Sequence, residues 1–349
     1  MKIIFVRHSL LNRGGDKMIL AHANNLADSG HEVIIETSRV DTIFAISSKV
    51  KLSRIGERSK FGTLWRSFTT RYIDTDLLIA DIIPLACLLF IRNQGKVIYF
   101  AQDYDESYYS NIFQKLFVRS LYLLGLTFFR IRSIAVSRPL GDLLCSRFGA
   151  DVTVVENGVD TTIFYADPDH ELVAAKEGRK ALLLLSRTDH RKGFDIAVQT
   201  MERLQSKLTI PYEIWTVGEP AQGLFLGLIH RDFGYVGEAE LRRIMSSADL
   251  FLYPTRHEGL PLMPLEAMAS GCPVIVSSAS HAIAQHGINS IVLSQEDPQR
   301  YADELCILLS DQELCSRLIA GGLQTATFHT LKDAQQQFDN ILSGWIVAG

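Results

Sequence analysis

The stretch DLFLYPTRHEGLPLMPLEAMASGCPVIVS, residues 249–277, contains the alternation that decides the fold. The apolar run 249–253 ends at a proline and predicts a strand. A loop then leads into a predicted helix over 261–269, and the apolar run 273–277 predicts the next strand. Pro261 and Pro264 suit a first helical turn, where amide hydrogens have no partner within the helix. A strand, a helix and a second buried strand in this order predict a parallel sheet.

The same rhythm continues along the chain in two blocks. Strands are predicted in the first block over 2–6, 32–36, 76–80, 96–100, 133–137 and 151–156. A turn at 12–15 precedes a predicted helix at 16–29, which Gly30 ends. The second block adds strands at 181–186 and 212–217 and helices at 192–205 and 238–247. We therefore expect an α/β fold of two doubly wound, Rossmann-like parallel-sheet domains that face an interdomain cleft, with ligands at the carboxyl ends of the strands.

Between the blocks, residues 157–180 break the rhythm with Asn-Gly, Asp-Pro and mixed charges. This break predicts an N-terminal domain over 1–157, a linker over 158–180 and a second domain over 181–328. A C-terminal helix over 329–349 can pack back on the N-terminal domain.

Composition narrows the class of protein. A chain of 349 residues with 47% hydrophobic and 21% charged residues is globular and long enough for two domains. The longest apolar run, 82–91, is much shorter than the ~18 residues of a membrane-spanning helix, and the run 3–6 is too short for a secretory signal. Five cysteines without a CxxC pair indicate reduced thiols in the cytosol and no zinc site.

Charge is unevenly distributed. Residues 1–156 contain 20 Lys and Arg against 15 Asp and Glu, a balance of +5, and the remainder has a balance of −9. Within the first part, the stretch 111–132 (NIFQKLFVRSLYLLGLTFFRIR) mixes aromatic and basic residues. Such a stretch is either a buried domain helix with charged ends or a helix that lies on an anionic membrane, and the sequence leaves both interpretations open.

Two glutamates in the opening stretch suggest ligand chemistry. Glu258 lies before the predicted helix and Glu266 lies inside it. The free amides around 259–263, together with the helix dipole, suit an anionic group such as a diphosphate. One part of a ligand could then meet the loop carboxylate while another part meets the helix carboxylate.

The whole run HEGLPLMPLEAMASGCPVIVS resembles the Glu-x7-Glu signature of retaining GT-B glycosyltransferases. The similarity is to glycosyltransferase family four (glycosyl transferases group 1), of the bacterial surface-polysaccharide type. It implies that Glu258 contacts the donor sugar and that Glu266 contacts the ribose. Arg187 and Lys192, after the strand at 181–186, resemble the family's diphosphate-binding Arg and Lys, which would act in catalysis with Glu258.

The resemblance extends along most of the chain. Asn157-Gly158-Val159-Asp160 with Phe164 matches an interdomain segment of the family, and the place of Arg7, Gly14 and Gly15 matches its glycine-rich loop near the donor phosphate and the acceptor. The implied donor-binding residues, besides Glu266, are Gly259, Leu260, Pro261, Leu262, Gly218, Phe233 and Tyr235. The implied acceptor-binding residues are Gly14, Gly15, Gln102 and Asp103.

One position departs from the family pattern. Many members have a histidine after the fourth or fifth strand of the first domain, where this chain has Gln102 and Asp103. A glutamine can bind a sugar hydroxyl but cannot shuttle a proton, so a histidine-based mechanism is in doubt. His257 is equally suited to a loop role and to a sugar contact.

The resemblance implies a retaining hexosyltransferase that uses a UDP- or GDP-sugar and a glycan or lipid-linked acceptor in cell-envelope polysaccharide or lipopolysaccharide synthesis. We expect no cofactor, no metal and no nucleic acid, and a cytoplasmic location with peripheral contact at the inner face of the membrane. Two alternatives stay open: a nucleotide-sugar epimerase of similar fold, and a non-catalytic protein that binds sugar nucleotides.

Overall fold

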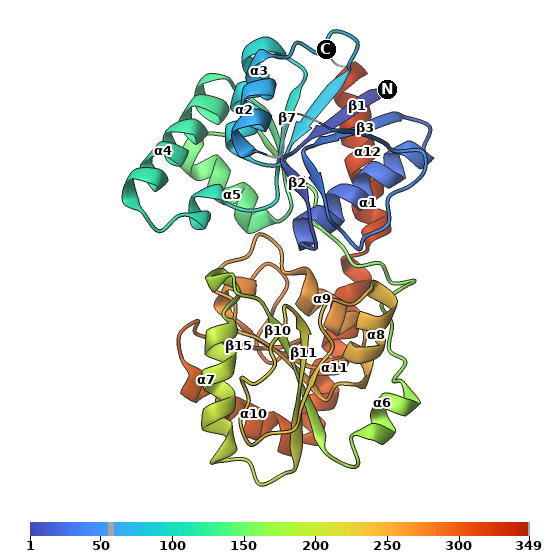
Figure 1. Ribbon diagram of the computed structural model, residues 1–349, viewed down its shortest axis with the longest axis vertical. Helices are drawn as coiled ribbons and strands as arrows, with labels where there is room; N and C mark the ends of the chain where they lie inside the picture. Colours follow the sequence, from blue (N-terminus) through green and yellow to red (C-terminus); the bar gives the residue numbers. More distant parts are fainter. Residues whose placement is uncertain (55–58, 348–349) are drawn as a thin grey trace. The chain divides into compact units, whose positions relative to one another are not determined.

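The computed structural model describes residues 1–54 and 59–347, and the chain divides into two compact units. The first unit comprises residues 1–157 and 332–349, and the second comprises residues 158–331. Each unit contains a parallel sheet with helices around it (Figure 1). The prediction of two Rossmann-like parallel-sheet domains is therefore confirmed, whereas the expected cleft between them stays a prediction.

The first unit is built on a seven-stranded sheet in the order β5-β3-β1-β6-β7-β8-β9. Its strands are β1 (Lys2–Val6), β3 (Glu32–Thr37), β5 (Lys51–Arg54), β6 (Leu77–Ala80), β7 (Val97–Ala101), β8 (Arg132–Ala135) and β9 (Val152–Val154). A separate two-stranded ladder joins β2 (Ser9–Leu10) and β4 (Arg39–Val40). The helical segments are α1 (Gly14–Asp28), α2 (Lys60–Thr69), α3 (Ile83–Arg92), η1 (Asp105–Tyr108), α4 (Ile112–Tyr122), η2 (Leu123–Phe128), α5 (Arg138–Phe148) and α12 (Leu331–Val347).

The second unit is built on a six-stranded sheet in the order β12-β11-β10-β13-β14-β15. Its strands are β10 (Lys180–Ser186), β11 (Tyr212–Gly218), β12 (His230–Asp232), β13 (Leu250–Tyr253), β14 (Val274–Ser277) and β15 (Ile291–Leu293). The helical segments are α6 (His170–Ala175), η3 (His190–Lys192), α7 (Phe194–Gln205), α8 (Glu238–Ser247), α9 (Leu262–Ala269), η4 (Ser278–Ser280), α10 (Pro298–Ser310) and α11 (Gln312–Phe328).

In both sheets the chain starts near the middle, builds outward on one side and then crosses to the other side. The crossing falls between β1 and β6 in the first unit and between β10 and β13 in the second. At such a switch point the loops after the two neighbouring strands turn away from each other and leave a crevice at the carboxyl edge. These two places are therefore where ligand-binding side chains are expected.

The segment 158–180, predicted as a linker, is instead part of the second unit. Its Phe164 is buried, and α6 lies within it. Polar contacts fix the segment to the unit: Lys176 Nζ lies 2.7 Å from Asp249 Oδ2, and Arg243 Nη2 lies 2.7 Å from Asp169 Oδ2. The prediction of a linker was wrong for a physical reason. The mixed charges of this segment are not solvated but form ion pairs with α8 and with the residue before β13.

The helix at the C-terminus, α12, packs inside the first unit. Its Phe338 is fully buried and stacks on the ring of His22 from α1, with ring centroids 4.3 Å apart. Burial lowers the pKa of His22 to about 3, so the ring is neutral and behaves as an apolar packing group at physiological pH. In Figure 1 the red α12 accordingly lies beside the blue α1, although the two are far apart in sequence.

Candidate functional site

At the β10–β13 switch point, Glu258 is held by three donors on one oxygen. Glu258 Oε1 accepts from Lys192 Nζ at 2.7 Å, from the Tyr253 hydroxyl at 2.5 Å and from Thr255 Oγ1 at 3.0 Å. The carboxylate side chain is 9% exposed and that of Lys192 is 24% exposed. The structure thus brings together two of the three predicted catalytic residues, and the fixed Oε1 leaves Oε2 as the oxygen available for a ligand.

A close backbone approach explains how Lys192 reaches Glu258. Gly193 has φ of +67°, and a Cβ added there would lie 1.9 Å from the Pro254 carbonyl oxygen. The Arg256 amide donates to the Arg191 carbonyl at 2.7 Å. Only glycine combines this backbone conformation with this contact, so the residue after Lys192 ties η3 to the loop that carries Glu258.

The third predicted catalytic residue, Arg187, belongs to a second cluster on the other side of β10. Its Nη1 donates to the Tyr235 hydroxyl at 2.9 Å, and its Nε lies 3.9 Å from Glu219 Oε1. Gly218, with φ of +119°, sits where a Cβ would meet the Ser186 carbonyl oxygen at 2.4 Å, and its amide donates to Gly234 O at 2.8 Å. The turns after β10, β11 and β12 therefore converge around Arg187.

The two aromatic candidates in this cluster differ. The ring of Phe233 packs edge-on against the buried Trp215, with centroids 5.5 Å apart. Tyr235 is 46% exposed and lies under the Arg187 guanidinium, 5.8 Å from its ring centroid. Tyr235 is thus the ring with a face open to a ligand, whereas Phe233 mainly fills the edge of the core.

Glu266 lies inside α9 and is 3% exposed. The helix begins at Leu262 with Pro261 as its N-cap, one residue later than predicted. Leu260, Pro261 and Leu262 are buried and Gly259 is half-buried, so the segment presents backbone rather than side chains at the helix start. The hydrogen bonds described above form a Lys192–Glu258 cluster and an Arg187–Tyr235 cluster.

The switch point of the first unit carries a buried charged group that the sequence only partly indicated. Arg7, directly after β1, pairs with Asp16 of α1, and its Nη2 lies 3.3 Å from Asp81 Oδ2 after β6. Asp16 is 1% exposed, and burial raises its pKa to about 6 although Arg7 opposes the rise. Asp16 and Asp81 were missed. Asp81 could have been found from its place at the end of a predicted strand.

The predicted acceptor-binding residues lie beside this group. Gly14 and Gly15 form the first turn of α1 rather than the predicted separate turn, because the Lys17 amide donates to the Arg13 carbonyl at 3.0 Å and so closes a helical turn around them. A Cβ on Gly15 would lie 3.7 Å from Gln102 Cβ, so the structure brings Gly15 and Gln102 together. Asp103 is half-buried, and its Oδ1 accepts from the Tyr104 amide at 2.8 Å.

The two carboxylates that follow face inward. Asp105 is 4% exposed and its Oδ2 accepts from the Ile83 amide at 2.7 Å, and burial raises its pKa well above the ordinary value. Glu106 accepts from the Tyr104 hydroxyl at 2.6 Å and pairs with Arg119 at 2.6 Å. Both therefore hold the loop after β7 in place, and within this loop Gln102 and Asp103 remain as candidates for contact with an acceptor.

Other functional candidates were not predicted. Tyr253 and Thr255 position Glu258, and Glu219 accepts from the Thr188 amide at 2.7 Å beside Arg187. Each ends or follows a strand of the second sheet, which is the signal that could have found them. Within the part of the chain that the structure describes, no group of three or more His, Cys, Asp or Glu side chains is arranged to hold a metal ion.

The family match found by comparison with known proteins lies in the second unit. Residues 179–311 match the family model of glycosyl transferases group 1. An uncharacterized glycosyltransferase, MJ1607 of Methanocaldococcus jannaschii, is 27% identical over 197 residues, which is 51% of this chain and 50% of that protein. The chain spans about half the length of the curated relatives it matches.

Solved structures cover the whole chain at low identity. Sucrose-phosphate synthase from Thermosynechococcus elongatus superposes with a TM-score of 0.80 at 16% identity, covering 100% of both chains. Anabaena Alr3699/HepE, solved in complex with UDP-glucose, gives a TM-score of 0.78 at 16% identity, covering 99% of this chain and 100% of that one. At these identities the likeness establishes the fold, which is that of GT-B glycosyltransferases. The match of residues 179–311, together with the relatives, supports the family of glycosyl transferases group 1 for this chain.

Proposed function

We propose that the protein is a retaining, metal-independent hexosyltransferase that moves a sugar from a nucleotide-sugar donor to a glycan or lipid-linked acceptor. The observation that carries the proposal is the Lys192–Glu258 pair at the β10–β13 switch point, with Oε1 of the carboxylate fixed by three donors. The family match over residues 179–311, which contain both residues, supports it.

The cations would hold the donor diphosphate. Lys192 Nζ has three hydrogens and gives one to Glu258, so it can bind a phosphate oxygen without releasing the carboxylate. Arg187 would exchange its bond to the Tyr235 hydroxyl for a bidentate bond to phosphate. The backbone amides of Leu260 and Leu262, at the start of α9, add positive potential. Together these groups would stabilise the charge that develops as the nucleoside diphosphate departs, with no cofactor or metal required.

Transfer with retention of configuration at the anomeric carbon is consistent with a front-face mechanism. Oε1 of Glu258 is occupied by three donors, which suits a carboxylate that orients sugar hydroxyls through Oε2 rather than one that attacks the anomeric carbon. In this route the acceptor oxygen forms its bond to the anomeric carbon as the bond to phosphate breaks. The acceptor proton passes to a donor phosphate oxygen.

For the substrates, we propose a UDP- or GDP-sugar, and the UDP-glucose complex of the Anabaena protein supports the first. The acceptor would meet Gly14, Gly15, Gln102 and Asp103 in the first unit. We place the reaction in cell-envelope polysaccharide or lipopolysaccharide synthesis, on the cytoplasmic face of the membrane.

A thermal-shift panel with UDP-, GDP-, ADP- and dTDP-sugars, followed by turnover assays with and without excess EDTA, tests the proposal. We expect one nucleotide class to stabilise the protein, and activity to be unchanged in EDTA. Activity that disappears in EDTA and returns with Mg²⁺ or Mn²⁺ would refute the metal-independent route. If none of the nucleotide sugars binds, the proposed transferase activity is refuted.

Glu266→Gln should weaken nucleotide binding by about tenfold or more. A carboxylate accepts hydrogen bonds from both ribose hydroxyls, whereas an amide offers one oxygen, and bonds to a charged group contribute about 1.5–3 kcal/mol each. Calorimetry with the product nucleoside diphosphate measures the change. Glu304→Gln, which removes a mostly buried carboxylate of α10 in the same unit, is the matched control. Equal binding by wild type and Glu266→Gln would remove the ribose assignment.

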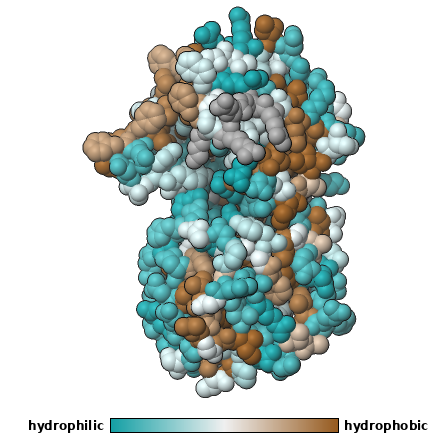
Figure 2. Space-filling model, in the orientation of Figure 1, coloured by the Kyte–Doolittle hydropathy of each residue, from teal (hydrophilic) through white to brown (hydrophobic). Residues whose placement is uncertain are grey.

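The membrane contact is supported by an exposed apolar surface on α4 and η2. Val118 and Tyr122 face the core, while large apolar side chains point outward. The exposed side chains are Ile112, Phe113, Leu116, Phe117, Leu123, Leu124 and Phe128. Figure 2 shows brown atoms gathered on the projection at the upper left, where Figure 1 places α4. No described helix is long and apolar enough to cross a membrane, so we propose that α4 lies on the bilayer surface.

Phe113→Ser combined with Phe117→Ser should reduce binding to lipid vesicles by about tenfold or more, because each buried aromatic side chain contributes ~1.5–3 kcal/mol. The two rings are 77% and 63% exposed, so their loss should not affect folding. Vesicle flotation measures the change. The matched control is Phe328→Ser, since that ring is 73% exposed on α11 of the second unit. Equal flotation of the double variant and the wild type would show that α4 does not meet the bilayer.

A further inference from the structure

A cationic pocket lies in the first unit at the amino ends of the strands. The candidate site residues of this unit lie at the opposite, carboxyl ends. It has a volume of about 670 Å³ and is lined by residues 71–73, 91–94 and Lys96. These residues belong to the segments that precede β6 and β7, whereas Asp81 and Gln102 follow those two strands. The pocket is therefore separate from the groups assigned to glycosyl transfer.

Hydrogen bonds hold the floor of this pocket in shape. Asn93 is 4% exposed, and its Oδ1 accepts from the Tyr72 amide at 2.7 Å. Its Nδ2 donates to the carbonyls of Thr70 and Leu89, at 3.1 and 2.9 Å. Every polar group of this buried amide is thus satisfied, and it ties the end of α3 to the segment after α2.

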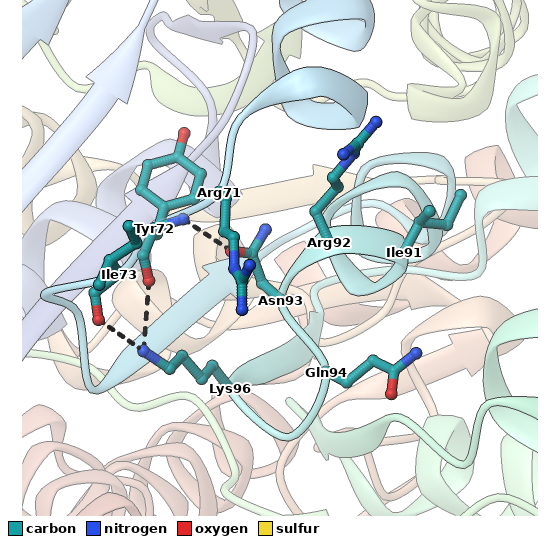
Figure 3. A pocket seen from close by; sticks show the side chains of 8 residues that line it. All are labelled: Arg71, Tyr72, Ile73, Ile91, Arg92, Asn93, Gln94 and Lys96. Atoms are coloured by element: carbon teal, nitrogen blue, oxygen red, sulfur yellow. Dashed lines mark hydrogen bonds between the residues drawn. The ribbon is translucent and has the colours of Figure 1, made fainter.

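The charged groups of the pocket are all positive. Lys96 Nζ donates to the carbonyls of Tyr72 and Ile73, at 3.2 and 2.9 Å, which leaves its third hydrogen for a ligand. Arg71 and Arg92 are exposed, and within the described residues neither forms an ion pair. Figure 3 shows the Arg71 guanidinium between Asn93 and Lys96, with Arg92 and Gln94 on the other side. Two guanidinium groups beside an ammonium group in a hollow favour a phosphate.

The rim of the pocket is apolar. Ile73 is 75% exposed and Ile91 is 43% exposed, and both line the pocket beside the cations. A free phosphate ion would gain nothing from these two side chains, whereas a lipid would place its phosphate among the cations and its first methylene groups against the isoleucines.

From this juxtaposition we propose that the pocket binds a phosphate-bearing group, and that its source is the headgroup of an anionic lipid. The proposal does not depend on the transferase activity. It also differs from contact through α4, because an apolar helix face should bind neutral and anionic bilayers, whereas the pocket should add a preference for anionic ones.

The test uses the full chain with Arg71→Gln combined with Arg92→Gln. The control double variant, Arg39→Gln with Arg138→Gln, removes the same charge from side chains of the first unit that are 59% and 83% exposed. Flotation compares vesicles of phosphatidylcholine with vesicles of phosphatidylcholine and phosphatidylglycerol. We expect the pocket variant to lose about tenfold more affinity than the control for the anionic vesicles, and neither to change with the neutral ones. Gln94→Glu, which places a negative charge in the pocket, should weaken anionic binding in the same way.

Calorimetry with glycerol phosphate and with inorganic phosphate shows whether the phosphate group comes from a lipid headgroup or from a soluble compound. Saturable binding of either compound that the pocket variant loses, without a change in vesicle binding, would support the phosphate site and assign it to a soluble ligand. If the pocket variant and Gln94→Glu match the control with vesicles and with both phosphates, the proposal is wrong.

Discussion

Glu258→Ala should lower turnover by about 100-fold while the affinity for the product nucleoside diphosphate stays nearly unchanged. If Glu258 orients sugar hydroxyls, its contribution grows as the ring flattens and positive charge develops at the anomeric carbon. Removal of an interaction that is stronger in the transition state lowers the rate rather than the affinity. A loss of ~3 kcal/mol from the transition state corresponds to this change.

The surroundings of Glu258 provide a graded series of variants. Tyr253→Phe removes one of the three donors to Oε1 and should lower turnover less than the loss of the carboxylate does. Glu296→Ala is the matched control. The Glu296 carboxylate is 64% exposed and pairs with Arg256, which lies in the same loop as Glu258. The variant therefore tests whether a shift of this loop is enough to lower turnover. If Glu258→Ala loses nucleotide affinity and keeps its turnover, the carboxylate faces the nucleotide and the sugar lies elsewhere.

The sequence predicted the layered fold well where its pattern was long and apolar. The helix at 238–247 matches α8, and the strand at 2–6 matches β1. In contrast, β5, β12 and β15 were missed, because they are short and lie at the edges of their sheets. An edge strand such as β12, with the sequence His-Arg-Asp, is formed by pairing with a neighbour and not by its own hydrophobic pattern.

For the site, the sequence could indicate which residues matter but not what they contact. Lys192 and Glu258 are 66 residues apart, and they meet because Gly193 allows the chain to touch Pro254. Nothing local encodes that approach. The preference for Tyr235 over Phe233 likewise depends on Trp215, which lies on a neighbouring strand and covers the phenylalanine ring.

Lys192→Ala should weaken nucleoside diphosphate binding by about tenfold to 100-fold and lower turnover by at least as much. The diphosphate carries negative charge before and after transfer, so a cation bound to it contributes in both states, and a hydrogen bond to a charged group contributes about 1.5–3 kcal/mol. The same change removes the cation that lies 2.7 Å from Glu258 Oε1, so that only the two neutral hydroxyl donors of Tyr253 and Thr255 remain. Calorimetry and steady-state turnover, measured on the same preparations, separate the two effects.

A double-mutant cycle with Glu258→Ala then measures how far the two side chains act as one unit. If Lys192 binds phosphate and also holds the carboxylate, the turnover losses should combine to less than their sum in free energy, whereas the loss of nucleotide affinity should come from Lys192 alone. Lys207→Ala is the control, because that lysine also pairs with a carboxylate of the second unit, Asp303, and the two side chains are 37% and 38% exposed. Nucleotide affinity that Lys192→Ala leaves intact would mean that the lysine only braces the loop and that the diphosphate is bound by Arg187 and the α9 amides. Full additivity in turnover would mean that Lys192 and Glu258 act independently of each other.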